Sequence, residues 1–257
     1  MIGDDAGMGD IRLVVQGDDL GMCRAVNEGI MTAATDGILT QTSVMAPTPW
    51  FGEGAAAALR IGLATGLHLT LTCEWEYLRW GPLSPGASLR DADGLFKRTV
   101  EAAAEGDAAD AIVEANAQID RAQAAGLELT YVDPHMGVSI TPAYEAACER
   151  LGVKFMYNNI NPHHVWDSPV IWLSLMSRRD RGARFAEELE KLGPGTHMVM
   201  AHPSVASDEI RGVTPSDAEN YFWAEPTRIA DLEALCAPEV RKVIENRNIE
   251  LVAARDL

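Results

Sequence analysis

The sequence has few basic residues and no long apolar run, which excludes two large classes of partner. Its 21 Lys and Arg residues stand against 38 Asp and Glu, giving a formal net charge of −17. Binding to a phosphate backbone needs clustered positive charge, so we expect no nucleic acid partner. No apolar run approaches the roughly 20 residues of a membrane-spanning helix, so we expect no membrane partner either.

The sequence also has no closely spaced cysteines. Its four cysteines are far apart, with no Cys-x-x-Cys spacing: Cys23, Cys73, Cys148 and Cys236. This spacing argues against a structural zinc site or a dithiol redox motif, and reduced thiols are typical of the cytoplasm. Residues 1–10 are rich in Gly and Asp and lack the basic and apolar parts of a signal peptide. We therefore expect a flexible N-terminus over 1–10 and a cytoplasmic protein.

Apolar runs rich in β-branched residues alternate with amphipathic, alanine-rich stretches along the whole chain. This alternation predicts a parallel sheet with helices outside it, because each parallel crossover needs a helix-sized connection. The expected strands are 11–16, 39–45, 65–72, 128–132, 153–157, 196–201 and 249–253. The expected helices are 24–35, 52–60, 107–125, 142–151, 181–192, 230–235 and 238–246.

We expect an α/β fold, an irregular (β/α) TIM-like barrel, forming a single domain over 11–257. No Gly-x-Gly-x-x-Gly motif follows the first strand, which disfavours an open dinucleotide-binding sheet. An insertion at about 74–96 interrupts the alternation with Gly, Pro, Ser and aromatic residues. Two interpretations are open for Trp75, Tyr77 and Trp80. They lie over the mouth of the barrel, where they stack on a sugar ring or close the site as a lid, or they pack the insertion onto the body of the barrel. We include these three and Arg228 as substrate-binding candidates.

Polar residues follow several of the expected strands. The first strand ends in Asp18-Asp19, a pair that taken alone is more typical of a turn or a helix cap. His68 lies in the third expected strand, Asp133 and His135 follow the fourth, and His202 follows the run 196–201. Residues at the carboxyl ends of barrel strands meet at one mouth, however distant they are in sequence.

These residue types together suggest a catalytic metal site. One carboxylate and two imidazoles leave positions open for water and substrate, and a second carboxylate is available as a base. The other histidines have weaker claims. His163-His164 is set among Asn and Pro residues and is interpreted as a solvated loop pair, and His197 begins a strand at the opposite end and is assigned no role.

The ordered set of motifs resembles the YdjC-like carbohydrate deacetylases (the ChbG/HpnK group). That family shows an Ala-Asp-Asp-Phe-Gly motif, a Gly-Leu-His-Leu strand, a Ser-His-x-His segment and a late His-Pro-Gly. The matching stretches here are 17–21 (GDDLG), 66–69 (GLHL), 133–137 (DPHMG), 202–204 (HPS), 237–240 (APEV) and 248–251 (NIEL). The resemblance runs from about residue 11 to the end of the chain.

The resemblance implies an irregular β/α barrel that removes an N-acetyl group from a sugar with one divalent metal ion. Carried over by position, the metal ligands are Asp19, His68 and His135. Asp18 is then the general base and His202 the general acid. An Asp-His-His site suits Zn²⁺ or Mg²⁺, with Mn²⁺ and Co²⁺ as further candidates. The partner is a small sugar, and a homo-oligomer is compatible with the sequence.

The chain departs from the family pattern at two histidine positions, which are Gly137 and Ser139 here. All three proposed ligands are kept, so the departure affects the substrate pocket more than the metal. Two alternatives remain open. One is a metal-dependent hydrolase of another amide, an ester or a phosphoester that uses the same residues. The other is a non-catalytic sugar-binding barrel.

Overall fold

The computed structural model describes residues 10–155, 166–214 and 223–257. The His163-His164 pair and the end of the strand expected at 153–157 lie outside these residues. So does the expected flexible segment 1–10, apart from Asp10.

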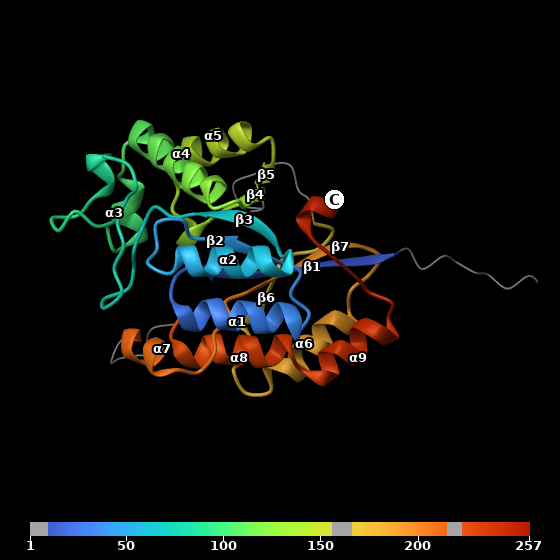
Figure 1. Ribbon diagram of the computed structural model, residues 1–257. Coiled ribbons are helices and arrows are strands. Elements are labelled where there is room, and N and C mark those ends of the chain that lie inside the picture. Colours follow the sequence, from blue (N-terminus) through green and yellow to red (C-terminus); the bar gives the residue numbers. More distant parts are fainter. Residues whose placement is uncertain (1–9, 156–165, 215–222) are drawn as a thin grey trace, which may run out of the picture.

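Strands and helices alternate along the described chain (Figure 1). The strands are β1 Ile11–Leu20, β2 Gln41–Val44, β3 Ala64–Leu69, β4 Leu129–Pro134, β5 Lys154–Phe155, β6 Ile171–Trp172, β7 Gly195–Ala201 and β8 Glu250–Val252. The helices are α1 Arg24–Thr35, α2 Phe51–Ile61, α3 Val100–Ala104, α4 Ala108–Ala124, α5 Thr141–Leu151, α6 Arg181–Glu190, α7 Asp208–Val213, α8 Glu225–Leu235 and α9 Pro238–Asn246. None of the helices in the described ranges has both the length and the apolar character that crossing a bilayer requires.

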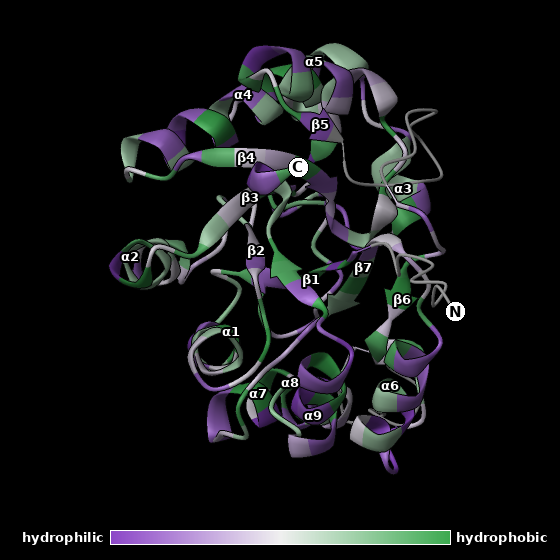
Figure 2. Cartoon of the chain, turned by 90° about the vertical axis from the view of Figure 1, so that its right-hand side faces the viewer, coloured by the Kyte–Doolittle hydropathy of each residue, from purple (hydrophilic) through white to green (hydrophobic). Residues whose placement is uncertain are grey.

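All strand pairs are parallel, and the sheet order is β5-β4-β3-β2-β1-β7-β6, with β8 also paired to β1. The first half of β1 pairs with β7 and β8, and its second half pairs with β7 and β2. The strands curl around a common centre with the helices outside them (Figure 2). Within the described residues no pair joins β5 to β6, so the ring is irregular there. The expected irregular (β/α) barrel is confirmed.

The main apolar core lies between the sheet and the helices. Side chains of β1, such as Leu13 and Val15, belong to the same buried cluster as Val26 and Ile30 of α1. A smaller cluster lies on the opposite faces of the strands. It contains Val14, Tyr131, Met198, Met200 and Val252 from the strands, together with Trp166. Successive side chains of a strand point to opposite faces, so one strand contributes to both clusters.

The insertion after β3 lies beside α3 in Figure 1 and is held by buried polar contacts. The carboxylate of Glu114 in α4 accepts hydrogen bonds from the backbone N–H groups of Leu83 (3.1 Å) and Ser84 (2.8 Å). The indole of Trp80 donates to the Thr72 carbonyl at 3.0 Å. These contacts hold the middle of the insertion against α4 and against Thr72, which lies between β3 and Glu74.

Candidate active site

Both carboxylates at the end of β1 line one pocket, although neighbouring residues in a regular strand point to opposite faces. The backbone explains this, because Asp19 has a φ of 74° and the pairing of β1 with β2 shifts register between Gly17 and Leu20. A left-handed φ is costly for a residue with a side chain and is typical of functional sites. Here it brings Asp18 and Asp19 to the same face.

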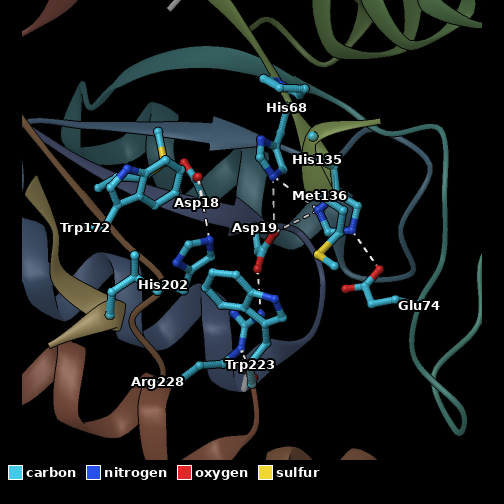
Figure 3. Close-up of a pocket in the computed structure, with 14 residues that line it drawn as sticks. Asp18, Asp19, His68, Glu74, His135, Met136, Trp172, His202, Trp223 and Arg228 are labelled. Atoms are coloured by element: carbon cyan, nitrogen blue, oxygen red, sulfur yellow. Dashed lines mark hydrogen bonds and ion pairs between the residues drawn. The ribbon is translucent and has the colours of Figure 1, made fainter. Parts of the chain in front are cut away.

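Asp19, His68 and His135 converge on one point (Figure 3). Asp19 Oδ1 lies 3.4 Å from His68 Nε2 and 3.3 Å from His135 Nδ1, and the two ring nitrogens are 3.2 Å apart. All three side chains are buried, and Asp19 Oδ1 has no hydrogen-bond partner among the described residues. A buried carboxylate oxygen facing two imidazole nitrogens fits a divalent cation, which would satisfy all three atoms.

Each of these histidines has a carboxylate behind it. Asp133 Oδ1 lies 2.9 Å from His68 Nδ1, and Glu74 Oε2 lies 2.8 Å from His135 Nε2. Such partners fix the tautomer and orientation of a ligating imidazole. They leave Nε2 of His68 and Nδ1 of His135 facing Asp19. Glu74 was not predictable as a site residue, since a single Glu in a loop rich in charged residues gives no signal in the sequence.

Asp19 is also held from its other side. Nη2 of Arg228 donates to Asp19 Oδ2 at 2.7 Å, and Nε donates to the Trp223 carbonyl at 2.8 Å. Burial raises the pKa of Asp19, but Arg228 and the facing imidazoles outweigh it and hold that pKa well below its usual value. Arg228 was expected to contact substrate. It does line the pocket, but its guanidinium is buried and paired with Asp19.

Asp18 lies beside the cluster in a different environment. Its Oδ1 accepts hydrogen bonds from Gln16 Nε2 at 2.7 Å and from Ser43 Oγ at 2.8 Å. Burial, together with the charges of Asp133 and Asp19, raises the pKa of this carboxyl. The two adjacent aspartates therefore have pKa values shifted in opposite directions.

His202 lies across from Asp18, with its Nε2 3.7 Å from Asp18 Oδ2. Ser174 Oγ lies 3.1 Å from His202 Nδ1 and donates a hydrogen bond to Asp231, so it accepts from the imidazole N–H. This leaves Nε2 facing Asp18. Burial lowers the pKa of His202 to about 4 despite the nearby carboxylates. An ordinary histidine has a near-neutral pKa, and the buried His202 therefore departs from the value expected of a general acid at neutral pH.

Asp18, His68 and Asp133 form a second close group of possible ligands. Its two carboxylates already share a donor, because the amide nitrogen of Gln16 donates to both Asp18 and Asp133. This group therefore has less capacity left for a cation than the group around Asp19.

The pocket has a volume of about 280 Å³. Its lining is Asp18, Asp19, His68, Glu74, Pro134, His135, Met136, Gly137, Trp172, Leu175, Met200, His202, Trp223 and Arg228. All five residues expected to carry the chemistry are in this set. Gly137, which replaces a family histidine, is there too.

The three aromatic candidates of the insertion do not line the pocket. Trp75 is fully buried with its ring 5.5 Å from the guanidinium of Arg228, and Trp80 is buried with its ring 6.0 Å from that of His135. Tyr77 is 60% exposed. Packing of the insertion, the second interpretation offered above, accounts for both tryptophans. The indoles that do line the pocket are Trp172 and Trp223.

Neither pocket indole was predictable from the sequence. Trp172 lies in β6, a strand of two residues that is too short to show a hydrophobic period. Trp223 lies just before α8, whose start was placed five residues too late at Ala230 instead of Glu225. Loop and strand-end residues of this kind become neighbours only through the fold.

Comparison with known proteins gives a consistent result. The model of the YdjC-like protein family matches residues 12–246. A carbohydrate deacetylase of Geobacillus stearothermophilus is 27% identical over 250 residues, which cover 95% of this chain and 96% of that protein. One of Thermus thermophilus is 28% identical over 261 residues, covering 93% and 91%.

A solved structure supports the fold. The Enterococcus faecalis V583 protein, named for cellobiose-phosphate cleavage, superposes with a TM-score of 0.80 at 21% identity. The superposition covers 96% of this chain and 99% of that one. The likeness therefore extends over the whole barrel.

Proposed function

Because the chain belongs to the YdjC-like family, we propose that it is a metal-dependent hydrolase that removes an N-acetyl group from an acetylated amino sugar or oligosaccharide. The observation that carries this proposal is the buried Oδ1 of Asp19, which has no hydrogen-bond partner among the described residues and faces a ring nitrogen of His68 and one of His135. The carbohydrate deacetylases among its relatives support the substrate class.

Asp19, His68 and His135 would hold one divalent ion, Zn²⁺ or Mg²⁺, with Mn²⁺ or Co²⁺ as alternatives. Such an ion supplies Lewis acidity, which polarises an acetamide carbonyl and lowers the pKa of water. Arg228 neutralises the second oxygen of Asp19 and so leaves Oδ1 directed at the two histidines. Asp133 and Glu74 hold the imidazoles in the orientation that this arrangement requires.

Asp18 acts as the general base in this proposal. Two donors, Gln16 and Ser43, hold its Oδ1, so its Oδ2 is the oxygen directed at His202. Burial and the neighbouring carboxylates raise its pKa, which makes it a stronger base than an ordinary aspartate.

His202 acts as the general acid. Its low pKa means that it starts neutral and must receive a proton during the reaction. Asp18 Oδ2, 3.7 Å away, is positioned to pass on the proton it takes from water. His202 then protonates the departing amine nitrogen.

The test is a screen for acetate release. The purified, metal-loaded protein is incubated with N-acetylated mono- and oligosaccharides, and in parallel with aryl esters and phosphate esters. Release of acetate from the sugars, with slower turnover of the other classes, is the expected result. Preferential turnover of aryl or phosphate esters would show that the same residues serve a different hydrolase.

We also propose a small sugar as the ligand and the cytoplasm as the location. All four cysteines are free. Free thiols are typical of a reducing compartment, and this supports a cytoplasmic protein.

A further inference from the structure

Resting on the deacetylase function proposed above, we propose a narrower substrate class: the pocket accepts uncharged N-acetylated sugars and rejects phosphorylated ones. This specificity depends on the residues that form the walls of the pocket, and not on its floor, where Asp19, His68 and His135 would bind the metal.

The first observation is the balance of charge in the lining. Three carboxylates line the pocket, those of Asp18, Asp19 and Glu74. Among the described residues, Arg228 is the one Lys or Arg in the lining, and its guanidinium is committed to Asp19 and to the Trp223 carbonyl. The sequences of the three segments outside the described residues, 1–9, 156–165 and 215–222, contain no Lys or Arg. None of these segments can add such a cation to the pocket.

The second observation is the chemistry of the walls. Around the acidic floor the lining consists of Trp172, Leu175, Trp223, Met136, Met200 and Pro134, all apolar or aromatic. Figure 3 shows Trp172 and Trp223 on the side of Asp18 and His202, and Met136 on the side of His135. Leu175 is 63% exposed, which places it at the rim. Indole faces suit the C–H face of a neutral sugar ring.

A phosphate ester fits neither part of this pocket. It carries a charge of about −1.5 to −2 at pH 7, and proteins recognise it with Arg, Lys or backbone amides. A divalent ion on the floor does not solve the problem, because the acetamide must take that position. The phosphate would then face the apolar and aromatic walls, which offer no Lys or Arg to replace its lost hydration. The net charge of −17 adds a repulsive field around the whole protein.

The test compares matched ligands on the metal-loaded protein. N-acetylglucosamine, its β-1,4-linked disaccharide and the 6-phosphate of each are titrated by calorimetry and assayed for acetate release. We expect the neutral ligands to bind at least tenfold more tightly. We also expect this difference in affinity between the neutral and the phosphorylated ligands to widen at low ionic strength, because screening of the repulsion is then weaker. A difference in affinity caused by shape alone would not depend on the salt concentration.

Three variants separate charge from size. Leu175→Lys places a cation at the rim and should reduce the difference in affinity between neutral and phosphorylated ligands at low salt. Leu175→Gln changes the same position without adding charge and should not narrow it. Leu59→Lys adds the same charge at an exposed position on α2, outside the pocket lining, and should leave the ratio of the two affinities unchanged.

The outcomes distinguish this inference from the proposed function. Phosphorylated ligands that bind as tightly as the neutral ones overturn the inference, whether or not acetate is released. Failure of the neutral sugars to bind also overturns it. Preferential binding of the neutral sugars without any acetate release supports the inference and counts against the deacetylase function.

Discussion

At the residue scale, the site depends on which atom of each side chain is left to face the centre. Arg228 occupies one oxygen of Asp19, Asp133 occupies one nitrogen of His68, and Glu74 occupies one nitrogen of His135. The three remaining atoms converge. Asp19 Oδ1 is thereby left as a buried carboxylate oxygen with no hydrogen-bond partner among the described residues.

The pKa of His135 predicts how metal binding depends on pH. Burial lowers this pKa, but Glu74 and Asp19 outweigh it and raise it to about 9 in the metal-free protein. A ligating imidazole must be deprotonated, so the ion competes with a proton below that pH. We expect the apparent affinity to rise by about tenfold per pH unit from pH 7 towards 9. Calorimetric titration in buffers of different ionisation enthalpy measures both the affinity and the proton released.

The same pKa fixes the sign of a stability effect. The pKa of His135 is higher in the folded protein than its ordinary value of 6.5. Its contribution to the free energy of unfolding is therefore complete below pH 6.5 and is lost as the pH rises through about 9. A metal affinity that stays flat between pH 6 and 9 would contradict this assignment of His135.

Loss of the charge of Asp18 should affect activity and leave metal binding unchanged. We expect Asp18→Asn to keep the metal and lose activity by about 10²- to 10⁴-fold, because the proton acceptor is removed. Metal content by atomic absorption and kcat by acetate release are measured on the same preparation. An Asp18→Asn protein with both full metal content and full activity would remove Asp18 from the role of base.

At the element scale, the insertion after β3 supplies a part of the site that the barrel strands do not. Its first residue, Glu74, reaches His135 Nε2, while the rest of the segment is anchored by Glu114 and by the buried Trp80. The placement of one loop therefore orients a proposed ligand, His135, which begins the short turn His135–Gly137 after β4.

We expect Glu74→Gln to lower metal affinity by about 10- to 100-fold, because His135 loses the carboxylate that orients it. The readout is a competition titration with a fluorescent chelator, which does not depend on catalysis. Glu76→Gln, in the same segment but at an exposed position, is the matched control. Equal affinities of the two variants would show that Glu74 does not position His135.

Strand β3, which carries His68, packs closely against β4. A Cβ added at Gly66 would lie 2.3 Å from Cε2 of Tyr131, a buried residue of β4. We expect Gly66→Ala to lower the free energy of unfolding by about 1–3 kcal/mol. Urea denaturation measures it. Gly193→Ala, where an added Cβ meets nothing within 4 Å, serves as the control, and an unchanged midpoint for Gly66→Ala would contradict the packing.

The elements with a clear period were predictable from the sequence. The range expected for the first helix, 24–35, agrees with α1, and 238–246 agrees with α9. Short elements were missed, as β6 and the six-residue α7 were not expected at all. A two-residue strand is defined by its pairing with β7 and not by its own sequence.

At the scale of the whole molecule, the parallel topology accounts for why the site was predictable. His68 and Asp133 are 65 positions apart in sequence yet are direct partners in the register of β3 and β4. Strand ends of a parallel barrel meet at one mouth, so the residue types at those ends sufficed to group Asp18, Asp19, His68, His135 and His202. The walls of the pocket were not predictable, because Trp172 and Trp223 come from segments whose position depends on the closed fold.

The central claim is that hydrolysis needs an ion held by Asp19, His68 and His135. Acetate release by the protein, stripped with a chelator and then reloaded with a divalent ion, tests it most directly, with Asp19→Ala alongside. We predict no turnover after stripping, recovery on reloading, and neither bound ion nor recovery for Asp19→Ala. Turnover at the full rate by the stripped protein, or by Asp19→Ala, would contradict the account.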